Sequence, residues 1–365
     1  MARLRHRATA LLAFLPLALG GCLGDGDDES HRVAGDTAVV YSSAPRTGVS
    51  AAAAEAVLAG ERRALAERRG RAGELAIELR ALSASDEDDE PWDPDVVSEN
   101  AERAADDPAA IAYIGELDFG ATAVSLPITN DAGLLQVSPA DGLTSLTRRP
   151  PGRPRAGPER YYPSGERSFA RIGPEDLREA ELLVARAREN GAERIAVVFD
   201  REIYGRELAG QIVARARDAG LEVGASEQYG GDVEDIPDLA SALAEGRPDA
   251  VLYAGVAGGG TGRLLAAIDS RMPGVPVYAA SGILARDAPI PAAPERVEAV
   301  GPRLSPERAG YLAMRLVLDA IEAGGRDRRR VIEAARRIGP SAEAGAFTVY
   351  RLGPDGRFAP SFSPR

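Results

Sequence analysis

Short runs of aliphatic and β-branched residues alternate with amphipathic segments along most of the chain, and this alternation limits the possible folds more than any other feature. The runs predict strands in two series. The first series comprises residues 37–41, 75–82, 111–115 and 134–139, and the second comprises residues 194–200, 221–229, 249–255 and 275–282. Apolar residues recur with a helical period in residues 50–70, 174–191 and 205–220. This alternation predicts an α/β fold with parallel sheets that are covered by helices on both faces.

A segment rich in Pro and Arg separates the two series. Residues 146–168 contain five Pro and six Arg without helical or strand periodicity, which predicts a loop. Its arginines leave two interpretations open, a contact with a partner and a solvated loop, and the second is the simpler. The interruption predicts two doubly wound lobes, each with its own core.

The loops that follow the predicted strands are small and polar. They comprise residues 42–48, 115–122, 138–143, 200–205, 255–262 and 280–284. Doubly wound sheets bind ligands beyond the carboxyl ends of their strands, so these loops can converge on one cleft if the lobes face each other. Helix N-termini at this edge suit an anion, and the hydroxyl of Tyr204 can reach the cleft from the start of its helix. The pattern predicts a site for a small molecule.

Residues suited to covalent catalysis are scarce in this chain. It has two histidines, His6 and His31, and one cysteine, Cys22. This scarcity argues against Ser-His-Asp triads, thiol nucleophiles and zinc sites, and no G-x-S-x-G motif occurs. A catalytic pair of carboxylates of the glycosidase type stays open as an alternative among the 56 acidic residues, although the sequence singles out no such pair. We therefore expect a binding protein and not an enzyme.

Two other segments fall short of known ligand-binding patterns. The Gly-rich residues 255–262 fit neither G-x-G-x-x-G nor the P-loop pattern, and the chain contains no lysine. The acidic residues 85–95 lack the spacing of a calcium loop. The formal charge of −12 argues against nucleic acid as a partner. The sequence therefore predicts no cofactor, no metal ion and no nucleic acid.

The first 21 residues have the organisation of a secretory signal peptide. Three arginines precede an apolar run at residues 8–19, which is too short to span a bilayer. The run ends in "LGGC", which resembles the lipobox of bacterial lipoproteins, in which the cysteine is acylated and begins the mature chain. The resemblance implies an extracytoplasmic protein that is held to the membrane only by lipid at Cys22, with residues 22–36 as an acidic tether. The alternative is a secreted protein with an incidental cysteine.

Four motifs in order carry a resemblance to a known family. They are "AAIAYIGELDFGATAVSLPITNDAGLLQVSPADGLTSLT" at 109–147, "FARIGPEDLREA" at 169–180, "RIAVVFDREIYGRELA" at 194–209 and "PDAVLYAG" at 248–255. Their order resembles the type I periplasmic solute-binding proteins of ABC importers, and among these the leucine/isoleucine/valine-binding branch. The resemblance runs from about Thr37 to Gly356. It implies two lobes that are joined by three crossovers and close on a ligand like a hinge.

The resemblance also implies a division of the chain and a ligand site. Lobe one would comprise residues 37–175 and about 302–338, and lobe two would comprise residues 176–301 and about 339–365. Four residues match the family's residue types at or beside its ligand site: Leu117, Ala140, Asp176 and Tyr204. Asp118, Phe119 and Gly120 stand where the family has a Ser-rich run that holds the ligand's carboxylate. Gly142 stands where a Thr has the same role.

Two further positions of the implied site depart from the family. Val256 stands where the family has an aromatic residue, and Ser281 stands where it has a Glu that pairs with the ligand's ammonium group. Asp118 or Asp141 could supply that negative charge, the ligand could lack an ammonium group, or both acids could lie exposed at the rim. Arg46 could hold an acidic ligand with two hydrogen bonds, or it could be an exposed loop residue.

These observations together predict a lipid-anchored extracytoplasmic receptor. It would capture a small polar ligand, an amino acid or a related compound, and deliver it to an ABC permease in the cytoplasmic membrane. The alternative is a lipid-anchored sensor of the same fold that acts on a protein partner. An extracellular hydrolase is disfavoured because His31 lies in the expected tether and Cys22 is the expected lipid site, so no histidine or cysteine is left for catalysis after the signal segment.

Overall fold

The computed structural model describes residues 31–86, 92–153, 155–230, 235–285, 289–290 and 296–361. The expected signal segment, Cys22 and most of the expected tether lie outside the described residues, as do residues 87–91 of the acidic run. Residues 31–365 form one compact unit, and the structure below is that of this unit. None of its described helices is long and apolar enough to cross a bilayer.

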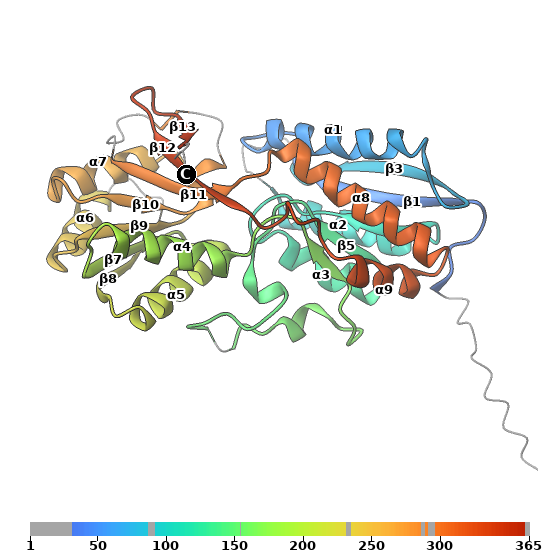
Figure 1. Ribbon diagram of the computed structural model, residues 1–365, viewed down its shortest axis with the longest axis horizontal. Coiled ribbons are helices and arrows are strands. Elements are labelled where there is room, and N and C mark those ends of the chain that lie inside the picture. The colour runs from blue at the N-terminus through green and yellow to red at the C-terminus, as the bar shows by residue number, and fades with distance from the viewer. Residues whose placement is uncertain are drawn as a thin grey trace, which may run out of the picture. The chain divides into compact units, whose positions relative to one another are not determined.

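The first sheet has six strands in the order β2-β3-β1-β4-β5-β6 (Figure 1). Their bounds are β1 Thr37–Ala44, β2 Arg71–Ala72, β3 Leu75–Ser83, β4 Ala110–Ile114, β5 Leu135–Ser138 and β6 Phe169–Arg171. All neighbouring pairs are parallel except β2 with β3. Every residue of β4 and β5 is buried, as expected for central parallel strands that are covered on both faces.

Five helices cover this sheet, and we call the sheet and these helices lobe one. They are α1 Ala51–Glu67, α2 Pro94–Asp106, α3 Thr122–Asp131, α8 Pro306–Gly324 and α9 Arg328–Ile338. Helices α1 and α8 approach closely because each has a glycine at the contact. A Cβ added to Gly60 would lie 1.9 Å from the carbonyl oxygen of Glu307, and one added to Gly310 would lie 2.1 Å from that of Val57.

The second sheet has seven strands in the order β13-β12-β11-β10-β9-β7-β8. Their bounds are β7 Arg194–Phe199, β8 Glu222–Gln228, β9 Ala250–Ala254, β10 Val277–Ala279, β11 Val297–Pro302, β12 Phe347–Leu352 and β13 Phe358–Pro360. Strands β7 to β11 pair in parallel, whereas β12 and β13 form an antiparallel C-terminal hairpin on β11. With its helices, this sheet is lobe two.

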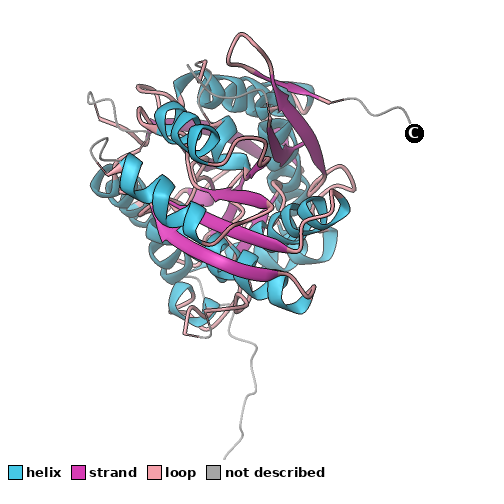
Figure 2. Ribbon diagram, turned by 90° about the vertical axis from the view of Figure 1, so that its left-hand side faces the viewer, coloured by secondary structure: helices cyan, strands magenta, loops and turns pink. Residues whose placement is uncertain are grey.

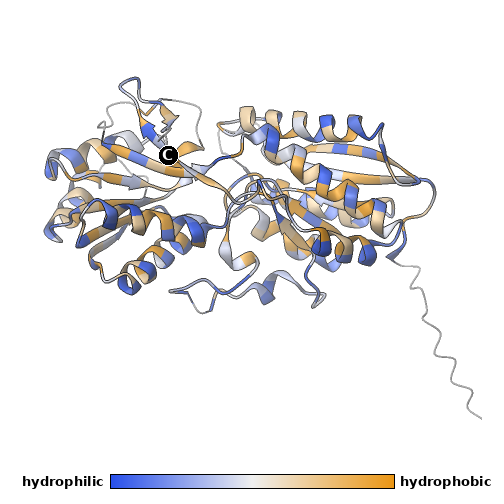
Figure 3. Ribbon diagram, viewed as in Figure 1, coloured by the Kyte–Doolittle hydropathy of each residue, from blue (hydrophilic) through white to orange (hydrophobic). Residues whose placement is uncertain are grey.

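Helices cover both faces of the second sheet, which faces the viewer in Figure 2. They are α4 Asp176–Glu189, α5 Ile203–Asp218, α6 Ile236–Glu245 and α7 Thr261–Arg271. Alternate residues of β7 enter different cores, because Ile195 and Val197 pack with α4 and α5 while Ala196 and Val198 pack with α6 and α7. Figure 3 shows the same arrangement as largely hydrophobic strands between helices that carry both hydrophobic and hydrophilic residues.

The predicted fold class of two doubly wound α/β lobes is confirmed. Each of the eight predicted strands forms within a few residues of its expected bounds. The predicted loop at 146–168 is irregular apart from the end of one short 3₁₀ turn at Thr144–Leu146 and a second such turn at Pro158–Tyr161. The chain passes between the sheets three times, from β6 to α4, from β11 to α8 and from α9 to β12.

Candidate functional site

A cavity of about 600 Å³ is lined by residues of both lobes. Lobe one contributes the first turns of α1 and residues 117–119, which follow β4. Lobe two contributes residues 281–285, which follow β10, together with Tyr350 and Phe358 of the C-terminal hairpin. The loops after β4 and β10 leave the carboxyl ends of parallel strands, which is where doubly wound sheets bind ligands. We therefore take this cavity as the candidate site.

Five of the residues expected at the site line this cavity. They are Leu117, Asp118, Phe119, Ala140 and Ser281. The structure brings them together because β4 and β5 are neighbours in the first sheet and β10 is central in the second. Most other lining side chains are aliphatic or aromatic, so the cavity has an apolar wall with few polar groups, as small-molecule sites commonly have.

Asp118 is the acidic residue of the cavity wall and is only 8% exposed. Its Oδ1 accepts a hydrogen bond of 2.6 Å from the Ser50 hydroxyl. Its Oδ2 is enclosed and has no hydrogen-bond partner among the described residues. Burial raises the pKa of Asp118 to about 7, the Ser50 bond opposes the rise, and the nearby charge of Asp141 adds to it.

Tyr204 lies behind the cavity and is fully buried. The Phe119 ring lies over the Tyr204 ring with 4.4 Å between the ring centroids. The Tyr204 hydroxyl donates a hydrogen bond of 3.0 Å to Oε2 of Glu179, and the Ser281 backbone N–H donates one of 2.5 Å to Oε1 of the same residue. Phe119 of lobe one therefore packs over the hydrogen-bonded Tyr204 of lobe two.

Glu179 of α4 is the residue at this site that the sequence analysis missed. It contacts Ser281, the position at which the family resemblance implied a missing carboxylate. Burial raises the pKa of Glu179 to about 7. A signal was present in the sequence, because Asp176, Glu179 and Leu183 are spaced on one face of the expected helix, and that face is buried. An acidic residue on an apolar helix face indicates a polar partner at that point.

Asp141, Gly142 and Asp176 lie together behind the cavity, and none of them lines it. Asp141 accepts backbone hydrogen bonds from Thr122 at 3.2 Å and from Leu143 at 3.1 Å. A Cβ on Gly142 would lie 2.1 Å from Oδ1 of Asp176, so the glycine leaves room for this carboxylate. Burial raises the pKa of Asp176, and the charge of Glu179 raises it further.

The other expected site residues lie outside the cavity lining. Arg46 is exposed, and its Nη2 donates a hydrogen bond of 3.0 Å to the carbonyl oxygen of Ala81. The backbone N–H of Val256 donates one of 2.6 Å to Oδ2 of Asp200. Gly120 has a φ of +85°, which favours glycine, and a Cβ there would lie 3.6 Å from Ile203 of lobe two.

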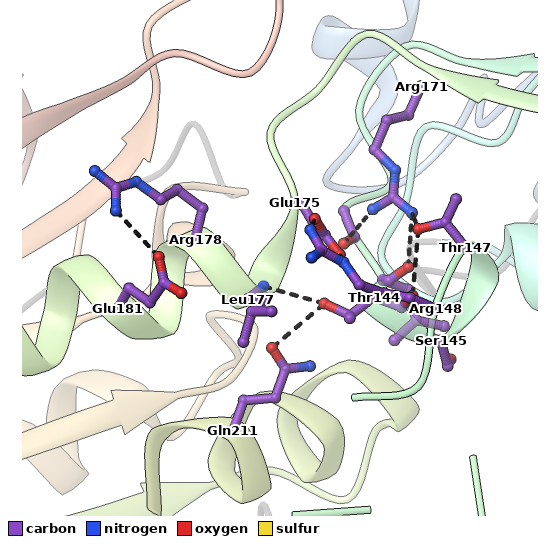
Figure 4. Close-up of polar contacts among 12 residues, drawn as sticks. Thr144, Ser145, Thr147, Arg148, Arg171, Glu175, Leu177, Arg178, Glu181 and Gln211 are labelled. Atoms are coloured by element: carbon purple, nitrogen blue, oxygen red, sulfur yellow. Dashed lines mark hydrogen bonds and ion pairs between the residues drawn. The ribbon is translucent and has the colours of Figure 1, made fainter. Parts of the chain in front are cut away.

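The segment after β5 ties the two lobes together beside these acids (Figure 4). Thr144 Oγ1 accepts a hydrogen bond of 3.0 Å from the backbone N–H of Leu177 and donates one of 3.3 Å to Gln211. The backbone N–H of Ser145 donates a hydrogen bond of 2.8 Å to Glu207. These bonds join the loop of lobe one to α4 and α5 of lobe two, so the lobes are connected through buried polar contacts as well as through the chain.

A larger hollow of about 840 Å³ lies between the Pro-rich loop and helix α5. Five exposed arginines contribute to its lining: Arg153, Arg155, Arg160, Arg206 and Arg217. It contains no residue from the loops after β4 or β10. The smaller cavity remains the candidate site because it joins those loops.

Within the described residues, no group of His, Cys, Asp and Glu side chains is arranged to hold a metal ion.

Comparison with known proteins agrees with this architecture. The chain is similar to a leucine-binding protein, LivK, from Thermotoga maritima, with 20% identity, a TM-score of 0.69, and coverage of 89% of this chain and 98% of that one. It is similar to an ABC transporter substrate-binding protein from Desulfitobacterium hafniense in complex with Leu, with 19% identity, a TM-score of 0.67, and coverage of 89% and 100%.

A third similar structure is a solute-binding protein of an ABC transporter from R. palustris in complex with benzoate. Here the identity is 17%, the TM-score is 0.64, and the coverage is 89% of this chain and 95% of that one. The search of curated proteins gave no significant match. The family model described as "Periplasmic binding protein" matches residues 42–293, which is more than half of the chain. With two doubly wound lobes and a cavity between their strand-end loops, the chain belongs to the type I periplasmic binding protein family.

Proposed function

We propose that this protein is a lipid-anchored extracytoplasmic receptor that captures a small ligand and delivers it to an ABC importer. The observation that carries the proposal is the cavity of about 600 Å³ with walls from both lobes. A ligand in such a cavity contacts both lobes at once, and this gives the free energy that favours the closed form. Two similar structures, both of ABC transporter proteins, one in complex with Leu and one with benzoate, support a transport role.

In this proposal the ligand lies against Leu117, Asp118, Phe119, Ala140 and Ser281. Tyr204 and Glu179 hold the loop of Ser281 from behind, and Asp141, Gly142 and Asp176 support the wall of lobe one. The lobes divide between residues 175 and 176, near 301 and near 338, and the hinge lies at these three crossings. The lipid anchor is Cys22.

A ligand screen with a blocked-cavity variant tests the receptor role. The full chain in detergent is screened by thermal unfolding against amino acids, amines, aromatic acids, short peptides and sugars. A ligand at about 100 times its Kd stabilises the folded protein by about 2.7 kcal/mol, so a true ligand raises the unfolding temperature clearly. Ala53→Trp fills the cavity from α1, and we expect it to abolish the stabilisation.

The matched control is Ala59→Trp on the exposed face of the same helix, which should leave binding unchanged. Stabilisation that persists in Ala53→Trp would place the ligand elsewhere and contradict the proposed site. If no compound in the screen stabilises the protein, the receptor role for small molecules is contradicted.

A further inference from the structure

The described part of the cavity wall has one buried ionisable side chain in a largely apolar surface. Among the lining residues that the structure describes, only Asp118 and Arg357 are charged, and Arg357 is exposed in the turn of the C-terminal hairpin. The other lining side chains are aliphatic, aromatic, phenolic or hydroxyl-bearing. A ligand that is enclosed there lies close to Asp118 in surroundings that screen its charge weakly.

No cation is among the groups that shift the pKa of Asp118. Within the described part of the chain, its side chain has one hydrogen bond, from the neutral hydroxyl of Ser50, and its Oδ2 has no hydrogen-bond partner. Other buried acids at the site have more hydrogen-bond partners. Asp141 accepts hydrogen bonds from two backbone N–H groups, and Glu179 accepts them from the Ser281 N–H and the Tyr204 hydroxyl. An enclosed carboxylate with unused bonding capacity is stabilised by a nearby positive charge.

Further acidic side chains lie behind the same cavity wall. Burial is the main reason that the pKa values of Glu116 and Asp141 are raised, and the charge of Asp118 contributes to the rise at Glu116. The Arg171 guanidinium lowers the pKa of Asp141, although its two terminal nitrogens donate to the carbonyl oxygens of Gly142 and Leu143. Near pH 8, Asp118 with its pKa of about 7 is mostly ionised and Glu116 with its pKa of about 8 is partly so, which makes the electrostatic potential of this wall negative.

We propose, on the basis of the receptor function above, that the cavity selects ligands that present an ammonium or another organic cation to Asp118 and an apolar body to the rest of the wall. Charges act over several ångströms in apolar surroundings, so the selection does not require direct contact with Oδ2. A carboxylate at this wall is disfavoured by the same charge. Leu and benzoate, which are bound in two similar structures, both carry a carboxylate, and Leu carries an ammonium group as well. The proposed ligand differs from both because it has no carboxylate.

Three probes of nearly equal size and different charge test the inference. Phenethylamine, phenethyl alcohol and hydrocinnamate are titrated into the full chain in detergent at about pH 8 by calorimetry, where the amine is cationic and the acid is anionic. We expect the amine to bind at least about tenfold more tightly than the alcohol, and the acid to bind most weakly. Asp118→Asn should weaken amine binding by at least about tenfold and weaken alcohol binding by much less, so that the amine preference is lost.

The charge-matched control is Glu55→Gln, an exposed acid on α1, which should bind all three probes as the wild type does. Asparagine can still accept the Ser50 hydrogen bond, and thermal unfolding of Asp118→Asn verifies that it folds. If that variant is unfolded, wild-type titrations at about pH 5 serve in its place. The amine stays cationic there while Asp118 takes up its proton, so the amine preference should shrink, and an unchanged preference would overturn the inference.

The outcomes separate this inference from the receptor role. Equal binding of the amine and the acid, or no amine binding at millimolar concentration, overturns the cation selection. An amine preference that Asp118→Asn leaves unchanged overturns it as well. If the screen then finds another ligand that Ala53→Trp blocks, the receptor role still holds.

Discussion

At the residue scale, the chain buries several acids without partner cations. Glu61 of α1 is fully buried, and neither of its carboxylate oxygens has a hydrogen-bond partner among the described residues. Burial raises the pKa of Glu61 from 4.5 to about 8, and the pKa of Glu116 rises to about 8 for the same main reason. Such acids stay protonated in the folded state over a pH range in which the unfolded chain has released its protons.

This difference predicts how stability depends on pH. Because the folded-state pKa is higher than the unfolded one, the contribution to stability is complete below about pH 4.5 and is lost as pH rises through about pH 8. We expect the free energy of unfolding to fall between about pH 5 and pH 8, and Glu61→Gln to remove about 3 kcal/mol of that fall. Urea unfolding at both pH values measures it, with Glu55→Gln as the exposed control. A Glu61→Gln slope equal to that of the wild type would contradict the explanation.

Some residues at the candidate site could be predicted from the sequence, and others could not. Leu117, Ala140 and Ser281 could be expected there because each follows a strand whose carboxyl end must reach the cleft. Glu179 was missed because it comes from a helix face and not from a strand-end loop. Arg46 follows β1 but lies against Ala81, since a loop's direction depends on packing that the local sequence does not determine.

At the element scale, the alternation of strands and helices could be predicted from the sequence because apolar residues recur regularly in each element. The central strands β4 and β9 are continuous apolar runs, and every residue in them is buried. The C-terminal hairpin was not expected, because β12 and β13 are short and their residues are mostly half-buried or exposed. Yet the hairpin contributes Tyr350 and Phe358 to the cavity. An antiparallel addition at the edge of a parallel sheet depends on long-range pairing with β11, which no local pattern shows.

At the scale of the whole molecule, the proposed function requires a membrane anchor as well as a two-lobed receptor. The proposed anchor gives a direct prediction for Cys22, the only cysteine of the chain. Wild-type protein expressed in a bacterial host should incorporate labelled fatty acid and be recovered with membranes. The Cys22→Ser protein should incorporate none and be recovered in the soluble extracytoplasmic fraction, because stable anchoring requires acyl chains. Membrane recovery of the variant without label would contradict a lipid anchor.

The central claim is that one ligand bridges the two lobes and holds them closed. Small-angle X-ray scattering of the full chain in detergent, with and without the ligand that the screen identifies, tests it most directly. We predict a smaller radius of gyration for the wild type at saturating ligand and no change for Ala53→Trp. Scattering of the wild type that stays unchanged at saturation, with binding verified in the same sample, would contradict the account.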